Sequence, residues 1–214
     1  MVKGKPRKSS FAHDISGLAM TEALIVVPVL ILIFGAMVEF SIMVFQWSQT
    51  VKALEVGARR VVVSTPLTDI TPLSDYDTIP TGDPLPISSY TSVSCGADAS
   101  ACDTTQFNRL YYGADGTCGG LDTSGVVGIC DVAPFIRQSN VRITYHRANL
   151  GYAGRPNGPV LTVTVEVRNL YFDFFVLDTI FTAFQSAGLP SSIQIPAHPV
   201  SMTSEDLCNG RSCS

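Results

Sequence analysis

The chain has 214 residues, and 46% of them are hydrophobic, which suffices for one compact domain and a membrane segment but not for two large cores. Its net charge is only -4, and lysine and arginine are scattered except near the N-terminus. Proteins that bind nucleic acid need a basic face that pairs with phosphates, so no nucleic-acid partner is expected.

The N-terminus carries a basic leader, residues 1–17, followed by a long apolar run. Residues 23–38 read ALIVVPVLILIFGAMV without a charge, and apolar residues recur as far as Trp47. Together with residues 18–20, this run exceeds the ~20 residues that cross the hydrocarbon core of a bilayer. We therefore predict a transmembrane segment at about residues 23–45, with Trp47 at the outer interface.

The charges on either side of the run predict its orientation. Four basic residues precede it closely and the first one beyond it is Lys52, so the N-terminus is expected in the cytoplasm and the remainder outside. A cleaved secretory signal is the alternative, because it too joins a basic region to an apolar stretch. The run is longer than the usual ~7–15 residues and lacks an A-x-A cleavage site, which favours a retained segment.

Two carboxylates flank the uncharged run, although an ionised side chain in hydrocarbon costs on the order of 3 kcal/mol. Glu39 is expected to reach interfacial water. Glu22 lies only a few residues into the apolar stretch, so we interpret it as a functional acid with a cationic partner. The alternative is that Glu22 only marks the cytoplasmic interface. Pro28 removes one helical hydrogen bond and is expected to kink the helix.

The helix is predicted to continue out of the membrane as far as about Val63, within a segment of residues 18–64. Apolar residues recur near the 3–4 spacing of an amphipathic helix, and Pro66 follows the last of them. At 1.5 Å per residue, this helix would be roughly 65–70 Å long. Its outer half would then be available for a sheet to pack on.

A connecting region is predicted at residues 65–135. Residues 65–86 are rich in Pro, Thr, Ser and Asp, which is typical of a surface loop, and Phe107 to Tyr112 are expected to form one short helix. Four cysteines lie in the later part of this region. It is interpreted either as a partner-binding insertion or as a disulfide-stapled loop that covers the sheet.

All six cysteines follow the apolar run, as expected if only the downstream part meets an oxidant. Disulfides are therefore favoured, with short-range pairing as the working hypothesis: Cys95 with Cys102, Cys118 with Cys130, and Cys208 with Cys213. A metal site is the competing interpretation, but the chain has no CxxC or HxxxH spacing. No metal and no cofactor is expected.

Residues 136–214 are predicted to hold an antiparallel sheet, a helix and a cysteine-bearing tail. The runs 141–145 and 160–167 alternate and are rich in β-branched residues, with a Gly/Pro/Asn-rich loop between them, so they predict an antiparallel pair. Phe174 begins an apolar stripe at helical spacing that ends near Gly188 and Pro190. A core-packing helix is favoured there over a second membrane-facing surface, because the stripe is short and holds Asp173 and Asp178. Ile193 and Ile195 predict a further short strand.

The fold class that follows is α+β, with a long, partly transmembrane N-terminal helix packed on a small antiparallel sheet and a disulfide-bearing loop region. No motif of catalysis accompanies it: the chain has no GxSxG, no HExxH and no phosphate-cradling glycine loop. We expect no enzyme. A thiol enzyme would need a free reactive cysteine.

Gly17-Leu18-Ala19-Met20-Thr21-Glu22, behind its basic leader, resembles the processing site of type IV prepilins. The resemblance implies that a prepilin peptidase cuts after Gly17 and makes Leu18 the new N-terminus. The new amine would pair with Glu22 of a neighbouring subunit. Because both charges lose hydration in low dielectric, such a pair would set helix register more than it adds stability.

The stretch from Gly17 to Val63 resembles the TadE-like proteins, minor pseudopilins of the tight adherence (Flp) pilus. The matching features are Gly17, Glu22, Pro28, the pair Glu39-Phe40, and Gly57-Ala58-Arg59, although Ala23 stands where the family commonly has an aromatic residue. The resemblance implies a structural subunit of the bacterial inner membrane with a periplasmic domain. Its partners would be the prepilin peptidase, other pilins or pseudopilins, and pilus assembly proteins. The alternative is an uncleaved single-pass envelope protein whose disulfide domain binds a partner or surface ligand.

Overall fold

The computed structural model describes residues 15–74, 79–85, 91–119, 125–154, 160–176, 178, 192–195 and 198–204. The chain divides into two compact units. The first unit consists of Met1–Ile42 and Asp173–Ser191, and the second of Met43–Phe172 and Ser192–Ser214.

Helix α1, Ile15–Val61, confirms the predicted long N-terminal helix and contributes to both units. It continues through Pro28 without interruption. Arg59 and Arg60 lie in its last turn, where positive side chains interact favourably with the partial negative charge of the helix end. Two bonds of the final turn close on shorter spacing, from Val63 N to Arg60 O and from Ser64 N to Val61 O, just before Pro66.

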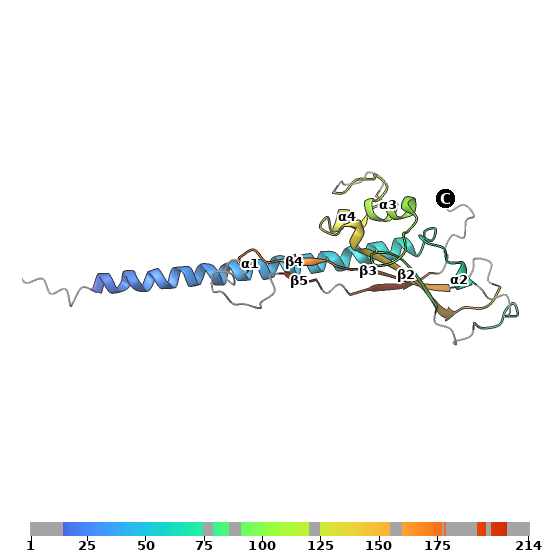
Figure 1. Cartoon of the computed structure of the whole chain (residues 1–214), viewed down its shortest axis with the longest axis horizontal. Coiled ribbons are helices and arrows are strands. Elements are labelled where there is room, and N and C mark those ends of the chain that lie inside the picture. Colours follow the sequence, from blue (N-terminus) through green and yellow to red (C-terminus); the bar gives the residue numbers. More distant parts are fainter. Residues whose placement is uncertain are drawn as a thin grey trace, which may run out of the picture. The chain divides into compact units, whose positions relative to one another are not determined.

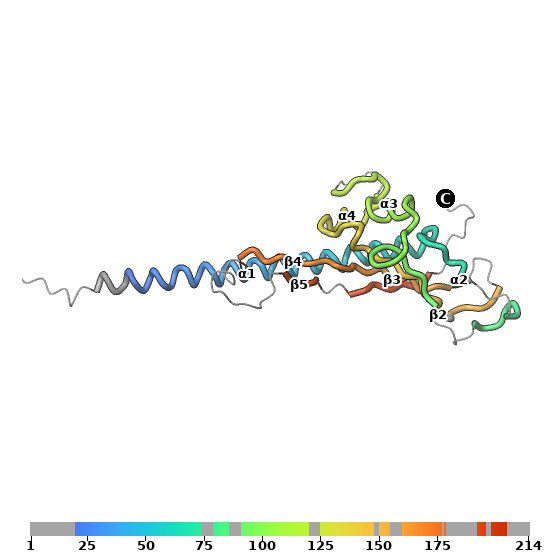
Figure 2. The backbone as a smooth tube through the Cα atoms, viewed as in Figure 1, coloured from blue at the N-terminus to red at the C-terminus, as the bar shows by residue number. Residues whose placement is uncertain are grey.

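The main sheet of the second unit has four antiparallel strands in the order β1-β2-β3-β6. These are β1 (Ser92–Gly96), β2 (Val141–Leu150), β3 (Val160–Val167) and β6 (Val200–Thr203). The predicted pair is the centre of the sheet, where β2 and β3 run side by side in opposite directions (Figure 2). Strand β2 extends five residues beyond its predicted end, and the edge strands β1 and β6 were not predicted.

The core of the second unit lies between one face of this sheet and the C-terminal part of α1 (Figure 1). Residues of β3 alternate between buried and half-buried, so that Leu161, Val163 and Val165 point to one side. On α1, the side chains of Leu54 and Ala58 are fully buried. A period of two on the strands and of three to four on the helix places both apolar faces inward, as patterning predicts.

The connecting region contains a short helix and buried residues, although its composition predicted a surface loop. A short helix, α2 (Thr71–Ser74), interrupts the segment expected to be a surface loop, and Leu67, Leu73 and Leu85 are buried. Buried Arg147 of β2 helps to hold α2, because its guanidinium donates to the carbonyl oxygens of Leu73 at 3.2 Å and Pro72 at 3.3 Å. A run rich in turn-forming residues is thus tied to the sheet through its few leucines and its backbone.

Short helices and disulfides cover the rest of the second unit: α3 (Thr104–Tyr112), α4 (Ile129–Val132) and the 3₁₀ helix η2 (Gln138–Asn140). Helix α3 was predicted, and the Asp103 carboxylate caps it by accepting from Gln106 N at 2.9 Å. Disulfides join Cys95 to Cys102 and Cys118 to Cys130, two of the three expected pairs. Cys208 and Cys213 lie outside the described residues.

A second, two-stranded sheet pairs β4 (Tyr171–Asp173) with β5 (Ser192–Gln194). Strand β5 contains Ile193, and Ile195 N donates to Leu170 O at 2.9 Å, so a short strand occurs where it was predicted. The predicted helix from Phe174 to Gly188 lies mostly outside the described residues. Within them, Val176 and Asp178 are helical.

Candidate assembly and membrane surface

Among the described residues, most of the exposed large hydrophobic side chains lie on the N-terminal part of α1. Large hydrophobic side chains are exposed around this helix from Met20 to Trp47, with Leu24 at 76%, Phe34 at 63% and Phe45 at 61% exposure. Of the most apolar stretch within Met20–Val61, only 6% is buried, which is unlike the core helix of a soluble protein. By length and composition this helix can cross a membrane. An exposed apolar surface of this extent indicates contact with lipid or with other proteins.

Ser41, a polar residue within this surface, bonds to the backbone of its own helix. The hydroxyl of Ser41 donates to the carbonyl oxygen of Met37, four residues earlier, at 2.7 Å. This local pairing removes the need for water, and it is how serine and threonine are accommodated in apolar helices. The surface is therefore compatible with a single-pass membrane segment.

The residues expected to be processed lie at the start of α1. Gly17 and Leu18 belong to its first turns, and Glu22 follows with an exposed side chain. Glu22 and Glu39 are 17 residues apart, which is about 25 Å along a helix. This separation is slightly less than the ~30 Å thickness of a hydrocarbon core, so the two carboxylates bracket the uncharged run.

Glu39 does not reach interfacial water as expected, because its side chain is only 6% exposed. Its Oε1 accepts from the backbone N–H groups of Phe175 and Val176, both at 2.5 Å. This contact could not be predicted from the residues around Glu39, because its partners are 136 and 137 residues away in sequence. The only available signal was the carboxylate within an apolar run, which requires a partner.

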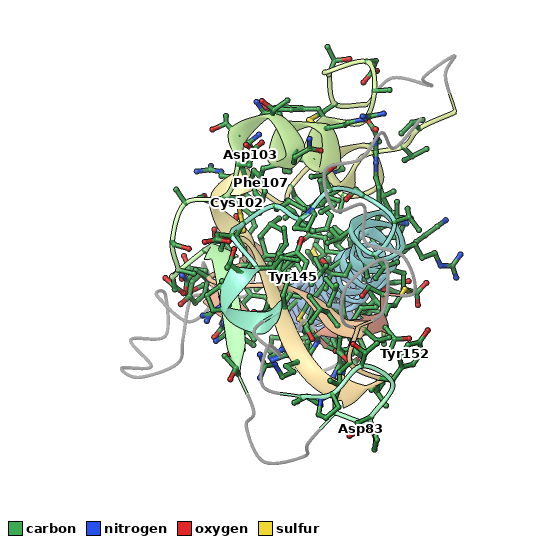
Figure 3. The ribbon with its side chains drawn as sticks, turned by 90° about the vertical axis from the view of Figure 1, so that its right-hand side faces the viewer. Asp83, Cys102, Asp103, Phe107, Tyr145 and Tyr152 are labelled. Carbon is green, nitrogen blue, oxygen red and sulfur yellow. A yellow bond between two sulfur atoms is a disulfide. The ribbon has the colours of Figure 1, made fainter. Side chains whose placement is uncertain are left out.

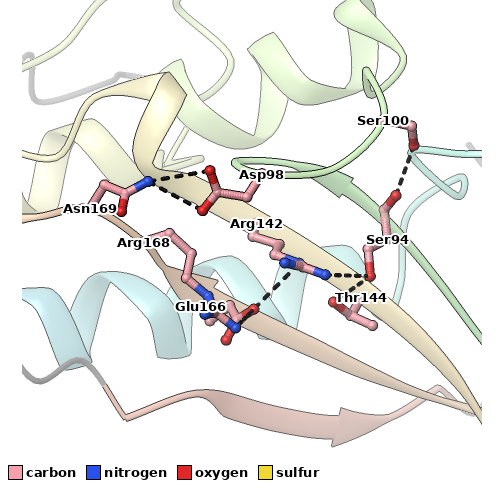
Figure 4. A network of polar contacts seen from close by, with 8 residues as sticks. All are labelled: Ser94, Asp98, Ser100, Arg142, Thr144, Glu166, Arg168 and Asn169. Atoms are coloured by element: carbon pink, nitrogen blue, oxygen red, sulfur yellow. Dashed lines mark hydrogen bonds and ion pairs between the residues drawn. The ribbon is translucent and has the colours of Figure 1, made fainter.

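The second unit holds a polar network on the outer face of its sheet (Figure 4). Glu166 Oε1 lies 2.9 Å from Arg168 Nη2 and 3.5 Å from Arg142 Nε, and the hydroxyls of Ser94 and Thr144 are 3.0 Å apart. These contacts connect β1, β2 and β3 across the sheet. They contain no nucleophile paired with a base, so the network stabilises the strands and does not form an active site.

Two titratable groups of β2 have shifted pKa values. Burial raises the pKa of Tyr145 to about 12, against the opposing effect of the hydrogen bond from Leu67 N. Partial burial lowers the pKa of His146, and the charge of Glu166 opposes that shift. Figure 3 shows Tyr145 in the interior of the unit, whereas Asp83 and Tyr152 lie at its edge. Both shifts follow mainly from packing.

The described residues offer no metal site, because no three His, Cys, Asp or Glu side chains gather closely enough to hold an ion. A shallow hollow of 420 Å³ opens beside the C-terminal end of α3. Its only charged lining residue is Arg109, among Asn108, Tyr112, Gly113, Ala114 and Gly116. The residues that line this hollow do not include a nucleophile paired with a base. The exposed surface of α1 is the candidate functional site.

Comparison with known proteins bears on this same helix. Residues 17–59 match a family model described as TadE-like protein. The match begins at the glycine of the expected processing site and ends at Arg59, two residues before the end of α1. No curated protein and no solved structure matches the chain.

Proposed function

Residues 17–59 of this chain are TadE-like, and from this premise we propose that it is a minor pilin-like structural subunit that takes part in assembly of a tight adherence (Flp) pilus at the bacterial inner membrane. The family is a structural, pilus-associated one, in keeping with a chain in which no motif of catalysis was found. The observation that carries the proposal is the coincidence of the family match with the exposed apolar helix α1.

The proposed placement has the N-terminus in the cytoplasm, α1 across the membrane and the second unit in the periplasm. Basic residues before the apolar run support this orientation. The two disulfides support an oxidising compartment for the second unit, since such bonds are rare in the cytosol. The helix is then the element through which the subunit joins other pilins.

Processing after Gly17 belongs to the same proposal. A prepilin peptidase would cut the bond to Leu18 and leave a positive amine close to the cytoplasmic end of the apolar run. Glu22 is four residues from that new N-terminus, and its side chain is exposed, so another helix can approach it. Pairing of the amine with Glu22 of a neighbouring subunit would fix the axial register of adjacent helices, since a slipped register leaves both charges without a partner.

The direct experiment is the mass of the N-terminal peptide of the mature protein from its native host, with wild-type and Gly17→Leu chains compared. We expect a start at Leu18 for the wild type and an unprocessed N-terminus for Gly17→Leu, together with loss of pilus assembly. Met20→Leu, which changes a nearby apolar residue and leaves the glycine, is the matched control and should be processed normally.

An uncleaved envelope protein whose disulfide-bonded unit binds a partner is the second candidate. The observation in its favour is that the two disulfides lie in the part of the chain that the TadE-like match does not cover. Normal pilus assembly by the Gly17→Leu chain would favour this candidate. An intact Gly17-Leu18 bond in wild-type protein, from cells with an active prepilin peptidase, would contradict the first.

A further inference from the structure

A second segment of the first unit lies against the apolar part of α1. The backbone N–H groups of Phe175 and Val176 both donate to Glu39 Oε1, and these residues begin a stretch in which Val176 and Asp178 are helical. The first N–H groups of a helix have no partner within it, so an external acceptor is required. Glu39 provides that acceptor from the middle of another helix.

The same segment contacts α1 at a second position, Gly35. A Cβ atom placed on Gly35 would come within 2.9 Å of Val176 Cγ1, so Val176 packs directly on the bare backbone at this glycine. Gly35 is one helical turn closer to the N-terminus than Glu39, which is roughly 6 Å. Both lie within the predicted membrane segment of residues 23–45, and Gly35 within the uncharged run of residues 23–38.

The contact between Glu39 and the two N–H groups is favourable where water is absent. A carboxylate in hydrocarbon is costly, and so is a backbone N–H without an acceptor. In water, solvent would satisfy both groups, and burial of the Glu39 side chain would bring no advantage. In hydrocarbon, the N–H groups give the carboxylate its hydrogen-bond donors, and the carboxylate gives the N–H groups their acceptor.

We propose that residues 174–176 form a second membrane-contacting segment, which enters the outer leaflet beside α1 and is fixed there by Glu39. Phe175 is its lipid-facing residue, because it is 83% exposed while its backbone is held by Glu39. The partner is the acyl region of the bilayer. This inference rests on the membrane placement of α1 in the proposed function, but not on processing or pilus assembly.

A lone tryptophan reports the depth of each position. The chain has one tryptophan, so Trp47→Phe removes the native signal. In that background, Phe175→Trp probes the segment, Phe34→Trp probes α1, and Tyr152→Trp probes an exposed aromatic position of the second unit. The full chain is reconstituted at low density in phosphatidylcholine and phosphatidylglycerol vesicles, and its emission is measured with acyl-brominated lipids and with iodide.

We expect the emission of Phe175→Trp to be blue-shifted and quenched by brominated lipids nearly as strongly as that of Phe34→Trp. Iodide should quench Phe175→Trp at least about fivefold more weakly than Tyr152→Trp. If lipid quenches Phe34→Trp while Phe175→Trp is open to iodide, the second segment is overturned and the membrane placement of α1 stands. A Phe175→Trp signal shielded from both quenchers would mean that protein covers this position, which also overturns the proposal. If lipid does not quench Phe34→Trp, the membrane placement and this inference fail together.

The role of Glu39 is tested in the same Phe175→Trp chain. Glu39→Ala removes the acceptor and should reduce lipid quenching of the introduced tryptophan by at least about half, whereas Glu39→Gln keeps an acceptor oxygen and should retain most of it. Glu55→Ala, at an exposed position further along α1, is the matched control and should change nothing. Unchanged quenching in Glu39→Ala would overturn the anchoring role. Phe34→Trp in the Glu39→Ala background verifies that α1 still inserts.

Discussion

The hydroxyl oxygen of Tyr145 accepts a hydrogen bond from Leu67 N at 3.0 Å, across 78 residues of sequence. Both residues are buried, Tyr145 completely. Tyr145 lies on the inner face of β2, whereas Leu67 follows the end of α1, so the bond ties the start of the connecting region to the sheet. A buried N–H at this point has no access to water, which makes the tyrosine hydroxyl its required acceptor.

Replacing Tyr145 with phenylalanine should therefore destabilise the protein by about 1–3 kcal/mol, because the ring remains and Leu67 N loses its acceptor. Denaturant unfolding of the full chain in detergent, followed by circular dichroism, measures the change. Tyr152→Phe is the matched control, since Tyr152 is 49% exposed. Equal stability of Tyr145→Phe and wild type would show that the Leu67 amide is satisfied in another way.

The raised pKa of Tyr145 predicts a loss of stability in alkali. The folded state holds this pKa at about 12 and the ordinary value is 10.0, so the neutral phenol is favoured by folding. Its contribution is complete below pH 10 and is lost as the pH rises toward 12. Unfolding free energies measured from about pH 9 to 12 should fall less steeply in Tyr145→Phe than in the wild type. Parallel curves would contradict the assignment of this effect to Tyr145.

The central features of this fold can be predicted from local pattern. The apolar run of α1 and the strict alternation of β3 each encode their own conformation and their own buried face. The edge strands β1 and β6 do not, because they are only five and four residues long and each contains two serine or threonine residues. Their conformation comes from the hydrogen-bond ladder that their neighbours offer, such as the pairing of Cys95 with Ile143 and of Val165 with Val200.

The candidate site likewise has one part that the sequence predicts and one part that it does not. The exposed apolar surface of α1 follows from composition alone, whereas the contact of Glu39 with Phe175 depends on how distant segments meet. The sequence shows that a carboxylate lies in an apolar run and therefore needs a partner. It does not show that the partner is backbone, because every residue except proline carries the same N–H group.

Loss of either disulfide should destabilise the second unit by about 2–3 kcal/mol, from the chain entropy that the crosslinks remove from the unfolded state. The Cys118–Cys130 bond closes the longer loop, 12 residues against 7 for Cys95–Cys102, so its loss should cost about 0.5 kcal/mol more. Paired alanine variants are compared by denaturant unfolding without reductant. Alanine avoids a buried hydroxyl at Cys95 and Cys130, which are completely buried. Unchanged stability in either pair would contradict the entropic account.

His146 predicts a separate change in mild acid. Its pKa is lowered from 6.5 by partial burial, so folding favours the neutral imidazole. This contribution is complete above pH 6.5 and is lost as the pH falls through the folded pKa. Proton NMR titration of the full chain in micelles should give His146 a pKa below the ordinary value of 6.5, with His146→Gln used for assignment. Because the charge of Glu166 raises this pKa, Glu166→Gln should lower it further, and an upward movement would contradict the stated cause.

Gly57 allows α1 to pack closely on α4. A Cβ atom at this position would meet Ile129 Cδ1 at 3.0 Å and Cγ1 at 3.2 Å, while Val165 Cγ1 lies at 3.8 Å. Alanine requires Ile129 to shift by only a few tenths of an ångström, and its better helix propensity offsets part of that strain, so Gly57→Ala should be nearly neutral. Leucine cannot fit without moving the helix, and Gly57→Leu should cost about 1–3 kcal/mol.

The measurement is denaturant unfolding of the full chain, with Glu55→Leu as the control because it adds the same side chain at an exposed position of the same helix. That control should remain within about 0.5 kcal/mol of the wild type. A Gly57→Leu chain as stable as the control would show that α1 is not held against Ile129. The glycine of the Gly57-Ala58-Arg59 motif would then need an explanation other than packing. If only Gly57→Leu is destabilised, close approach of α1 to Ile129 of α4 accounts for that glycine, in the same way that Gly35 accommodates Val176 in the first unit.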